Sequence, residues 1–318
     1  MSTSSGVSAS GEQIALRHRD QRAVVVEVGG ALRVYSCQDH ELLDGYAEGQ
    51  MCPSARGQSL IPWPNRLRDG SYEFDSERLQ VALTEPAKHN AIHGLVRWAN
   101  WTPAERDENR VVMEHILHPQ DGYPFALKLQ IQYGLDDAGL TVTTTATNLG
   151  ATECPYGAGA HPYLTAGTET IDECQLKSPG TVWMRTDDQA IPTSSEPVDG
   201  TEYDFRAAKP IGDTQLDTGY GDLARDPDGR ARVTLTGPDG ASPVTLWMDE
   251  RYGYLMLFTG DSLPDSSRRR QGLGVEPMTC APNAFQSGDG LQRLAHGQSF
   301  TSAWGIEPSH GRQDGRAS

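Results

Sequence analysis

The middle of the chain holds one histidine in a setting that suits proton transfer. His161 lies in the run 155–164, where glycine and alanine precede it and Pro162 and Tyr163 follow. Small residues leave space beside the imidazole, and the proline fixes the local backbone. Because imidazole gains and loses its proton near neutral pH, this pattern predicts a positioned acid or base. A histidine without a chemical role in a glycine-rich turn is the alternative that this stretch alone leaves open.

Four other polar residues stand where packing does not explain them. Arg66 lies in the proline-bounded loop 62–70, His93 precedes a glycine, Asp217 lies in a glycine-rich turn, and Glu276 ends an apolar stretch before a proline. Each alone has a structural alternative: a salt bridge for Arg66, a hydrogen-bonded core position for His93, and a surface carboxylate for Glu276. Together with an acid–base histidine, they are typical of a site that holds a polyhydroxylated ligand and moves two protons.

The segments that must position these residues have the pattern of β-strands. Short runs rich in Val, Leu, Thr and aromatic residues alternate with Gly, Pro and Asp, and no stretch predicts a helix of three turns. Residues 126–133 alternate with period two and lead through a turn at 136–139 into 140–147, so we expect an antiparallel hairpin. Residues 243–248 and 254–258 predict a second hairpin. The expected fold class is all-β, with large antiparallel sheets packed face to face.

Length and charge limit the classes of partner. The 318 residues carry a formal net charge of −16, which argues against a nucleic-acid partner and favours a neutral or cationic small ligand. We interpret the one basic cluster, 268–270, as a solvated loop. No apolar run is long enough to span a bilayer and no secretory signal begins the chain, so we expect a cytoplasmic protein without a membrane partner. One domain is expected over residues 12–307, with 1–11 and 308–318 as flexible tails.

Several motifs of cofactor and metal chemistry are missing from the sequence. The chain has no phosphate-binding loop and no nucleophile elbow, and Gly157-Ala-Gly159 lacks the third glycine of a dinucleotide fingerprint. His115 and His118 lie three apart in a predicted strand, so they point to opposite faces and do not suggest a shared metal. The five cysteines form no C-x-x-C pair and are expected to be reduced.

A series of segments resembles the aldose 1-epimerase (galactose mutarotase) family. The segments follow one another in the family's order within residues 12–307, and they are 64–74, 90–101, 157–163, 216–218, 275–285 and 297–305. The resemblance implies a β-supersandwich fold. It also implies an isomerase that interconverts the α and β anomers of a free hexose or related aldose.

The resemblance assigns roles to individual residues. The family's general acid is the histidine of its His-Pro-Tyr motif, which is His161 here, and its general base is the glutamate near the C-terminus, which is Glu276. The reaction implied needs no metal or organic cofactor, its partner is a monosaccharide substrate, and the protein is expected as a monomer or homodimer. Three tryptophans are candidates to stack on a sugar face, namely Trp63, Trp98 and Trp247. The residues expected to bind the sugar are Asn65, Arg66, His93, Trp98, Tyr163 and Asp217.

Two alternatives to this function remain. A hexose-6-phosphate 1-epimerase, from a related branch on the same fold, would need a basic pocket for the phosphate, and that branch typically shows His-Thr-Tyr where this chain has His161-Pro162-Tyr163. A carbohydrate-binding protein could keep the pocket and lack turnover. The intact pair of His161 and Glu276, which we expect on opposite sides of the sugar ring, argues against it, because binding alone does not require a base opposite an acid.

Overall fold

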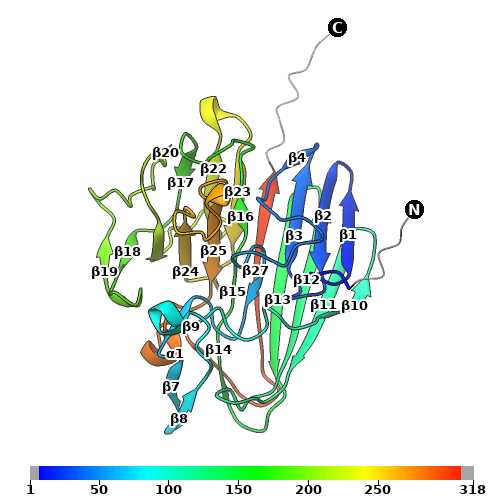
Figure 1. Cartoon of the computed structure of the whole chain (residues 1–318), viewed down its shortest axis with the longest axis vertical. Helices are drawn as coiled ribbons and strands as arrows, with labels where there is room; N and C mark the ends of the chain where they lie inside the picture. The colour runs from blue at the N-terminus through cyan, green and yellow to red at the C-terminus, as the bar shows by residue number, and fades with distance from the viewer. Residues whose placement is uncertain (1–6, 309–318) are drawn as a thin grey trace.

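The computed structural model describes residues 7–308, which form almost entirely antiparallel strands (Figure 1). The larger sheet has nine strands in the order β10-β11-β12-β13-β27-β23-β22-β17-β20. Their bounds are β10 (Thr102–Arg106), β11 (Arg110–Leu117), β12 (Leu127–Asp136), β13 (Gly139–Asn148), β27 (Ser299–Pro308), β23 (Val244–Met248), β22 (Ala231–Thr236), β17 (Gln175–Lys177) and β20 (Lys209–Pro210).

The second sheet has eight strands and carries most of the residues of interest. Its order is β19-β18-β21-β24-β25-β15-β5, and β16 also pairs with β25. Their bounds are β19 (Pro192–Pro197), β18 (Val182–Thr186), β21 (Asp217–Gly221), β24 (Tyr254–Phe258), β25 (Leu273–Met278), β15 (Gly159–Ala160), β5 (Ser59–Leu60) and β16 (Tyr163–Leu164).

Smaller elements complete the fold around these two sheets. A four-stranded sheet contains β1 (Gln13–His18), β2 (Gln21–Val26), β3 (Leu32–Cys37) and β4 (His40–Glu41), and its first two strands contact β12. Three two-stranded pairs are β14 (Cys154–Tyr156) with β26 (Gln292–Leu294), β6 (Arg66–Arg68) with β9 (Asn90–Ile92), and β7 (Ser71–Phe74) with β8 (Glu77–Gln80). The helices are α1 (Ala284–Ser287) and three 3₁₀ turns, η1 (Pro86–Lys88), η2 (Pro238–Gly240) and η3 (Ser266–Arg268).

The expected fold class is confirmed: the fold is all-β with large antiparallel sheets, and no described helix reaches three turns. The first expected hairpin is also confirmed, since β12 and β13 pair from Leu127↔Asn148 to Asp136↔Gly139. Leu127, Leu129, Ile131 and Tyr133 are all buried, as their period of two predicts. Within residues 7–308, no helix has the length and apolar character to cross a membrane.

The second expected hairpin is wrong. β23 pairs with β22 and β27 in the nine-stranded sheet, whereas β24 pairs with β21 and β25 in the eight-stranded sheet. The connection 249–253 therefore passes from one sheet to the other. Alternation along the chain identifies each segment as a strand, but it does not identify the partner of that strand.

Two surface expectations also need correction. Ser10 is buried and its carbonyl accepts a hydrogen bond from the Val28 N–H, so the packed part of the chain begins before residue 12. Residues 1–6 and 309–318 of the expected tails lie outside the described residues. The basic cluster is not simply solvated, because Arg268 pairs with Asp44 and Arg270 pairs with Asp172 and Asp261.

A single large cluster of buried side chains joins the two main sheets. It includes Leu129 and Ile131 of β12, and Leu255, Leu257 and Val275 of β24 and β25. All six residues of β25 are buried, which is the pattern of a central strand covered on both faces. This strand carries Glu276 into the interior.

Candidate active site

One pocket collects the two predicted catalytic residues and the six residues expected to bind the sugar. It encloses about 260 Å³, close to the small end of the range of about 300–1,000 Å³ seen for small-molecule sites. The eight predicted residues among those that line it are Asn65, Arg66, His93, Trp98, His161, Tyr163, Asp217 and Glu276. A pocket of this size suits a small molecule, and its wall is both polar and aromatic.

Pairing with β25 brings His161 next to Glu276. Gly159 of β15 pairs with Met278, and Tyr163 of β16 pairs with Gly274, so the short segment between them must run along β25. The Val275 N–H donates to the carbonyl of Pro162 at 3.0 Å, which fixes this segment further. Two residues distant in the sequence are thus placed side by side by backbone hydrogen bonds.

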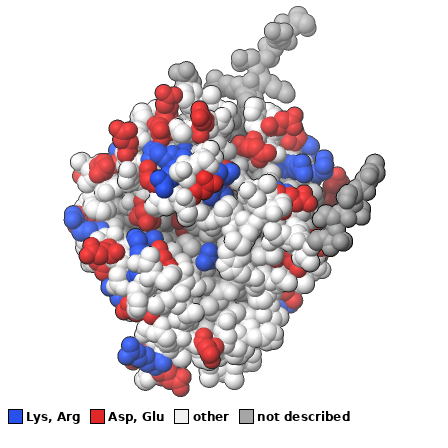
Figure 2. Space-filling view, in the orientation of Figure 1, with Lys and Arg blue, Asp and Glu red and all other residues white. Residues whose placement is uncertain are grey.

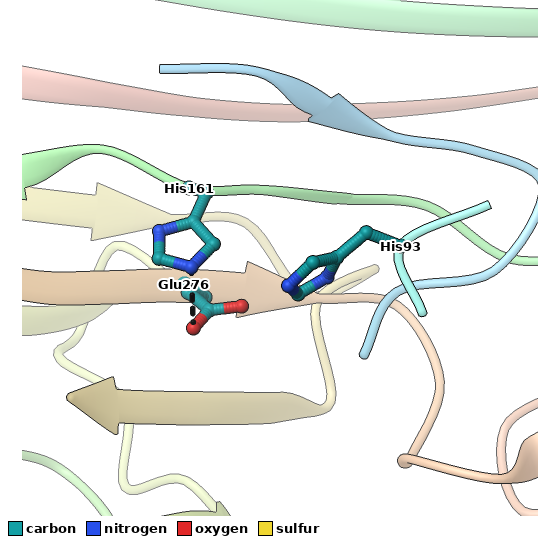
Figure 3. A group of neighbouring side chains, drawn as sticks. All are labelled: His93, His161 and Glu276. Carbon is teal, nitrogen blue, oxygen red and sulfur yellow. Dashed lines mark ion pairs between the residues drawn. The ribbon is translucent and has the colours of Figure 1, made fainter. Parts of the chain in front are cut away.

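The two side chains touch directly at the pocket wall. Nε2 of His161 lies 3.2 Å from Oε1 of Glu276, and the side chains are only 6% and 3% exposed (Figure 3). The Tyr163 ring stacks on the imidazole with ring centres 4.9 Å apart and planes tilted by 15°. This arrangement limits rotation of the imidazole and presents the two proton-carrying atoms as neighbours.

Burial shifts the pKa values of both groups toward their uncharged forms. Burial, together with the smaller effect of the positive charge of Arg56, lowers the pKa of His161 to about 3. Burial also raises the pKa of Glu276 well above its usual range, with a further rise from the charge of Asp217 and an opposing effect from Arg66. The pair therefore favours the form in which the carboxyl group carries one proton and donates it toward Nε2.

Arg66 is held in place by two carboxylates. Its Nε lies 2.9 Å from Oε2 of Glu85, and one terminal nitrogen lies 3.5 Å from Oδ2 of Asp217. Asp217 opens β21 and its side chain is 40% exposed, so it can still accept hydrogen bonds from a ligand. Arg66 and Asp217 thus present a fixed donor and a fixed acceptor on one wall of the pocket.

Asn65 and His93 flank the same end of the β6–β9 pair, because Asn65 precedes Arg66 and His93 follows its partner Ile92. Both backbones adopt left-handed angles, with φ of 53° and 64°, which is uncommon for residues other than glycine. The His93 N–H donates to the Asn65 carbonyl at 2.8 Å, and the Asn65 side chain accepts from the N–H of Arg66 at 2.9 Å. These hydrogen bonds stabilise an irregular loop that turns both side chains to the pocket.

Three buried polar atoms in the pocket have no hydrogen-bond partner among the described residues: Nδ1 of His93, Nδ1 of His161 and Oε2 of Glu276. Unpaired buried polar atoms are costly, so a cluster of them indicates a function. The His93 and His161 rings meet edge to face with centres 5.3 Å apart. A ligand rich in hydroxyl groups can donate to and accept from atoms of this kind.

The same three side chains are the group in residues 7–308 that could hold a metal ion. Their ligand atoms all lie within 4.8 Å of one another, and both imidazole rings point toward the Glu276 carboxyl (Figure 3). Two imidazoles and a carboxylate are ligands that Zn²⁺ accepts. Proton transfer, unlike metal binding, needs only two of these three side chains, His161 and Glu276, which are in direct contact.

Of the three candidate tryptophans, the structure brings only Trp98 to the pocket. It is 50% exposed and lines the opening. Trp63 is buried against Phe285, with ring centres 5.4 Å apart, and Trp247 is buried in the nine-stranded sheet under Arg230. Neither is among the pocket's lining residues. The expectation for these two residues is therefore wrong, because their aromatic surface belongs to the core.

Sequence reasoning missed two charged residues near the site. Arg97 lines the pocket beside Trp98, and Glu85 binds the Arg66 guanidinium from outside the pocket. The sequence offers a signal for Arg97, which directly precedes the predicted Trp98. No spacing points to Glu85, because it reaches Arg66 only through the pairing of β6 with β9.

Comparison with known proteins gives one consistent result. The family model described as "Aldose 1-epimerase" matches residues 12–307. The uncharacterized protein YihR of Escherichia coli K12 is 34% identical over 290 residues, which cover 91% of each chain. Galactose mutarotase of Homo sapiens is 27% identical over 154 residues, covering 46% of this chain and 43% of the human protein.

Solved structures show the same fold at low sequence identity. The GalM/aldose epimerase homologue of C. elegans superposes with a TM-score of 0.83 at 16% identity, covering 94% of this chain and 99% of that one. Galactose 1-epimerase of Lactobacillus acidophilus NCFM gives a TM-score of 0.75 at 20% identity, covering 94% and 95%.

Proposed function

Because the chain belongs to the aldose 1-epimerase family, we propose that it interconverts the α and β anomers of a free hexose or a related aldose. The observation that supports this most directly is the 3.2 Å contact between His161 and Glu276 in the wall of a small polar pocket. Two proton carriers in contact suit a reaction that moves two protons at one carbon atom. The sugar is the small-molecule partner, and the reaction uses the chain's own side chains.

The chemistry explains why the two carriers lie side by side. The anomeric hydroxyl and the ring oxygen are both bonded to C1, so the groups that serve them must be neighbours. In ring opening, Glu276 as the carboxylate takes the hydroxyl proton while His161 as the imidazolium protonates the ring oxygen. The C1–O5 bond breaks, and C1 becomes an aldehyde that can rotate.

Ring closure uses the products of the opening step. After opening, Glu276 holds a proton and His161 is neutral, which is the form that burial favours. Glu276 then donates to the carbonyl oxygen while His161 takes the proton of the C5 hydroxyl, and the new bond forms on the other face of C1. Closure thus returns Glu276 to the carboxylate and His161 to the imidazolium, the forms that the next opening needs. Direct proton exchange across the 3.2 Å contact interconverts this ion pair with the neutral pair that burial favours.

The remaining pocket residues orient the ring. Arg66 donates, Asp217 accepts, and His93 and Asn65 add polar atoms on the same side, so several hydroxyl groups can be held at once. Trp98, half exposed at the opening, offers an apolar face for the C–H face of a sugar. Orientation matters because the ring must present both oxygens of C1 to the acid–base pair.

A Glu276→Gln variant tests the proposal. The amide keeps the shape of the side chain but cannot take a proton, so we expect the enzymatic rate to fall about 10²–10⁴-fold. The rate is followed by polarimetry of freshly dissolved α-glucose and α-galactose. The control is Glu73→Gln, which makes the same change at the exposed position of β7 and should keep full activity.

Two further measurements separate catalysis from binding. His161→Gln should lose as much activity as Glu276→Gln, and the double variant should lose little more, because the two groups act as one unit. If Glu276→Gln equilibrates anomers as fast as the unchanged protein, the assignment of the base is wrong. If the unchanged protein binds a sugar in calorimetry but equilibrates it no faster than buffer does, the chain is a carbohydrate-binding protein.

A further inference from the structure

Arg97 sits at the tip of a firmly held turn beside the catalytic pair. The Ala99 N–H donates to the Val96 carbonyl at 3.1 Å and closes the turn around Arg97 and Trp98. The Gln58 side chain donates to the Arg97 carbonyl at 2.7 Å, which fixes the turn from outside. The backbone therefore presents the Arg97 side chain to the pocket from a fixed position.

The Arg97 guanidinium has no hydrogen-bond or ion-pair partner among residues 7–308. This is an exception, because every other buried or half-buried arginine in those residues has a polar partner for its guanidinium. Those arginines are Arg33, Arg56, Arg66, Arg68, Arg110, Arg225, Arg230, Arg232, Arg268 and Arg270. Half-buried cations in folded proteins are normally paired, so the pocket leaves a positive charge without its counterion.

The unpaired charge acts on the two pocket histidines, one of which is the proposed acid. Burial lowers the pKa of Arg97 itself, and the charge of Arg97 lowers the pKa of both His93 and His161. An anion bound to Arg97 would neutralise this charge and make protonation of His161 easier. That change favours the imidazolium that ring opening requires.

Arg66 does not offer the same opportunity to an anion. Glu85 and Asp217 already occupy its guanidinium, so an incoming anion would meet two carboxylates there. The acidic excess of the whole molecule also does not oppose binding at Arg97. On the face drawn in Figure 2, acidic and basic side chains are interspersed, and charges more than about 8 Å away are screened at physiological salt.

We propose that the pocket takes an aldose with an anionic substituent away from C1, and that the Arg97 guanidinium binds this substituent. The inference rests on the proposed function, because it assumes that C1 lies at His161 and Glu276. The planar fork of an arginine matches the paired oxygens of a carboxylate, a phosphate ester or a sulfonate. The Arg97 guanidinium carbon lies over the Trp98 ring, 5.9 Å from its centre. Trp98 would therefore lie against the sugar ring whose charged group Arg97 holds.

The test compares neutral and anionic sugars of one configuration. Anomerisation of glucose is measured against glucuronate, glucose 6-phosphate and 6-deoxy-6-sulfoglucose, by polarimetry or NMR exchange, for the unchanged protein and for Arg97→Gln. We expect kcat/KM for at least one anionic sugar to exceed that for glucose. In Arg97→Gln, kcat/KM for the preferred anionic sugar should fall by about 30- to 1,000-fold, and kcat/KM for glucose should fall far less. The most active of the three anions identifies the substituent.

Two further variants sharpen the comparison. Arg97→Lys keeps the charge but loses the fork, so it should retain part of the preference for the anionic sugar. Arg106→Gln removes one positive charge from exposed strand β10, away from the pocket, and should leave the preference unchanged. This control separates a local contact from a change in overall charge.

The outcomes distinguish this inference from the proposed function. If glucose is anomerised and none of the three anionic sugars is, or if Arg97→Gln lowers both classes equally, the assignment of Arg97 is overturned. If no sugar is anomerised, the proposed function fails and calorimetry decides about Arg97. Binding of an anionic sugar that Arg97→Gln abolishes supports the inference, and an absence of such binding overturns it.

Discussion

Glu276 is a carboxyl group that folding moves from water into the interior, so its protonation affects the stability of the fold. Burial raises its pKa above the ordinary value of 4.5, and the charge of Asp217 adds to the rise. As the pH rises through 4.5, the unfolded chain releases this proton while the folded chain retains it. The unfolded state is then favoured, and stability falls until the pH passes the folded pKa.

We therefore expect Glu276→Gln to gain stability relative to the unchanged protein as the pH rises. The two should be nearly equal at about pH 4, and the variant should unfold at a higher temperature at about pH 8. Calorimetric scans at a series of pH values measure the difference. A melting difference that does not change with pH would contradict the raised pKa of Glu276.

The two pocket histidines act in the opposite pH direction. Burial lowers the pKa values of His93 and His161, so the stability linked to their neutral forms is present above 6.5 and is lost as the pH falls. The unchanged protein and Glu276→Gln both keep His93, so its contribution is common to both and does not enter the difference between them. Glu73→Gln is again the matched control, since an exposed glutamate should show no such trend.

Zinc is expected to inhibit the proposed anomerisation. The ligand atoms of His93, His161 and Glu276 lie within 4.8 Å of one another, and the proposed mechanism assigns the reacting protons to two of these residues. A bound Zn²⁺ would occupy their lone pairs, so inhibition should be competitive with sugar. Chelation should leave the rate unchanged, because the side chains move both protons. Polarimetry with added ZnCl₂ or EDTA checks this, and activity that EDTA abolishes and Zn²⁺ restores would refute it.

At the scale of elements, the backbone bridge between Ile61 and Gly94 determines where His93 lies. Gly94 forms a bridge with Ile61, and the Leu95 N–H donates to the Ile61 carbonyl at 2.7 Å. The backbone of Gly94 has φ of 69°, and a Cβ atom there would lie 2.0 Å from the Ile61 oxygen. Only glycine allows both the left-handed angle and this close approach.

Gly94→Ala should therefore lower both stability and activity. We expect a loss of about 2–5 kcal/mol of unfolding free energy, from backbone strain and overpacking together. Gly200→Ala is the matched control, because Gly200 has φ of 72° with no atom near its Cβ position. It should show the strain alone. Denaturant titration and polarimetry measure the two effects, and equal losses in both variants would show that the contact with Ile61 is unimportant.

The sequence predicts strands better than it predicts their neighbours. The alternation of Leu127, Leu129 and Ile131 indicates a strand with one buried face, and the short turn that follows makes β13 one of its two neighbours. The connection 249–253 has the same local signal but leads from β23 to β24 in another sheet. The local alternation of apolar and polar residues cannot show that this connection passes from one sheet to the other, because that depends on packing between the sheets.

The sequence predicts those residues of the candidate site that belong to a recognisable motif. It does not predict the contacts that form only when distant segments pack together. All eight predicted residues line one pocket, and the strand pairs that bring most of them together are β15 and β16 with β25, β6 with β9, and β21 with β24. The direct contact of His161 with Glu276 was not predicted, since the sequence suggested that they face each other across a sugar ring. Nor could the sequence show that Arg97 is unpaired, because that depends on what surrounds it.

At the scale of the whole molecule, the two main sheets share one core. Leu129 of β12 and Leu257 of β24 are both completely buried in the same cluster, although they belong to different sheets. Neither sheet can open without exposing apolar surface of the other. This supports the proposal of a single domain and implies that the sheets unfold together.

We therefore expect one cooperative unfolding transition, with far-UV circular dichroism, tryptophan fluorescence and labelling of the buried Cys280 thiol changing together. Leu129→Ala and Leu257→Ala form a matched pair, one in each sheet. Each should lower the unfolding free energy by about 2–5 kcal/mol and shift all three signals equally, because the core is shared. If Leu129→Ala moved the fluorescence transition and left Cys280 protected, the sheets would be separate folding units and the single-domain proposal would fail.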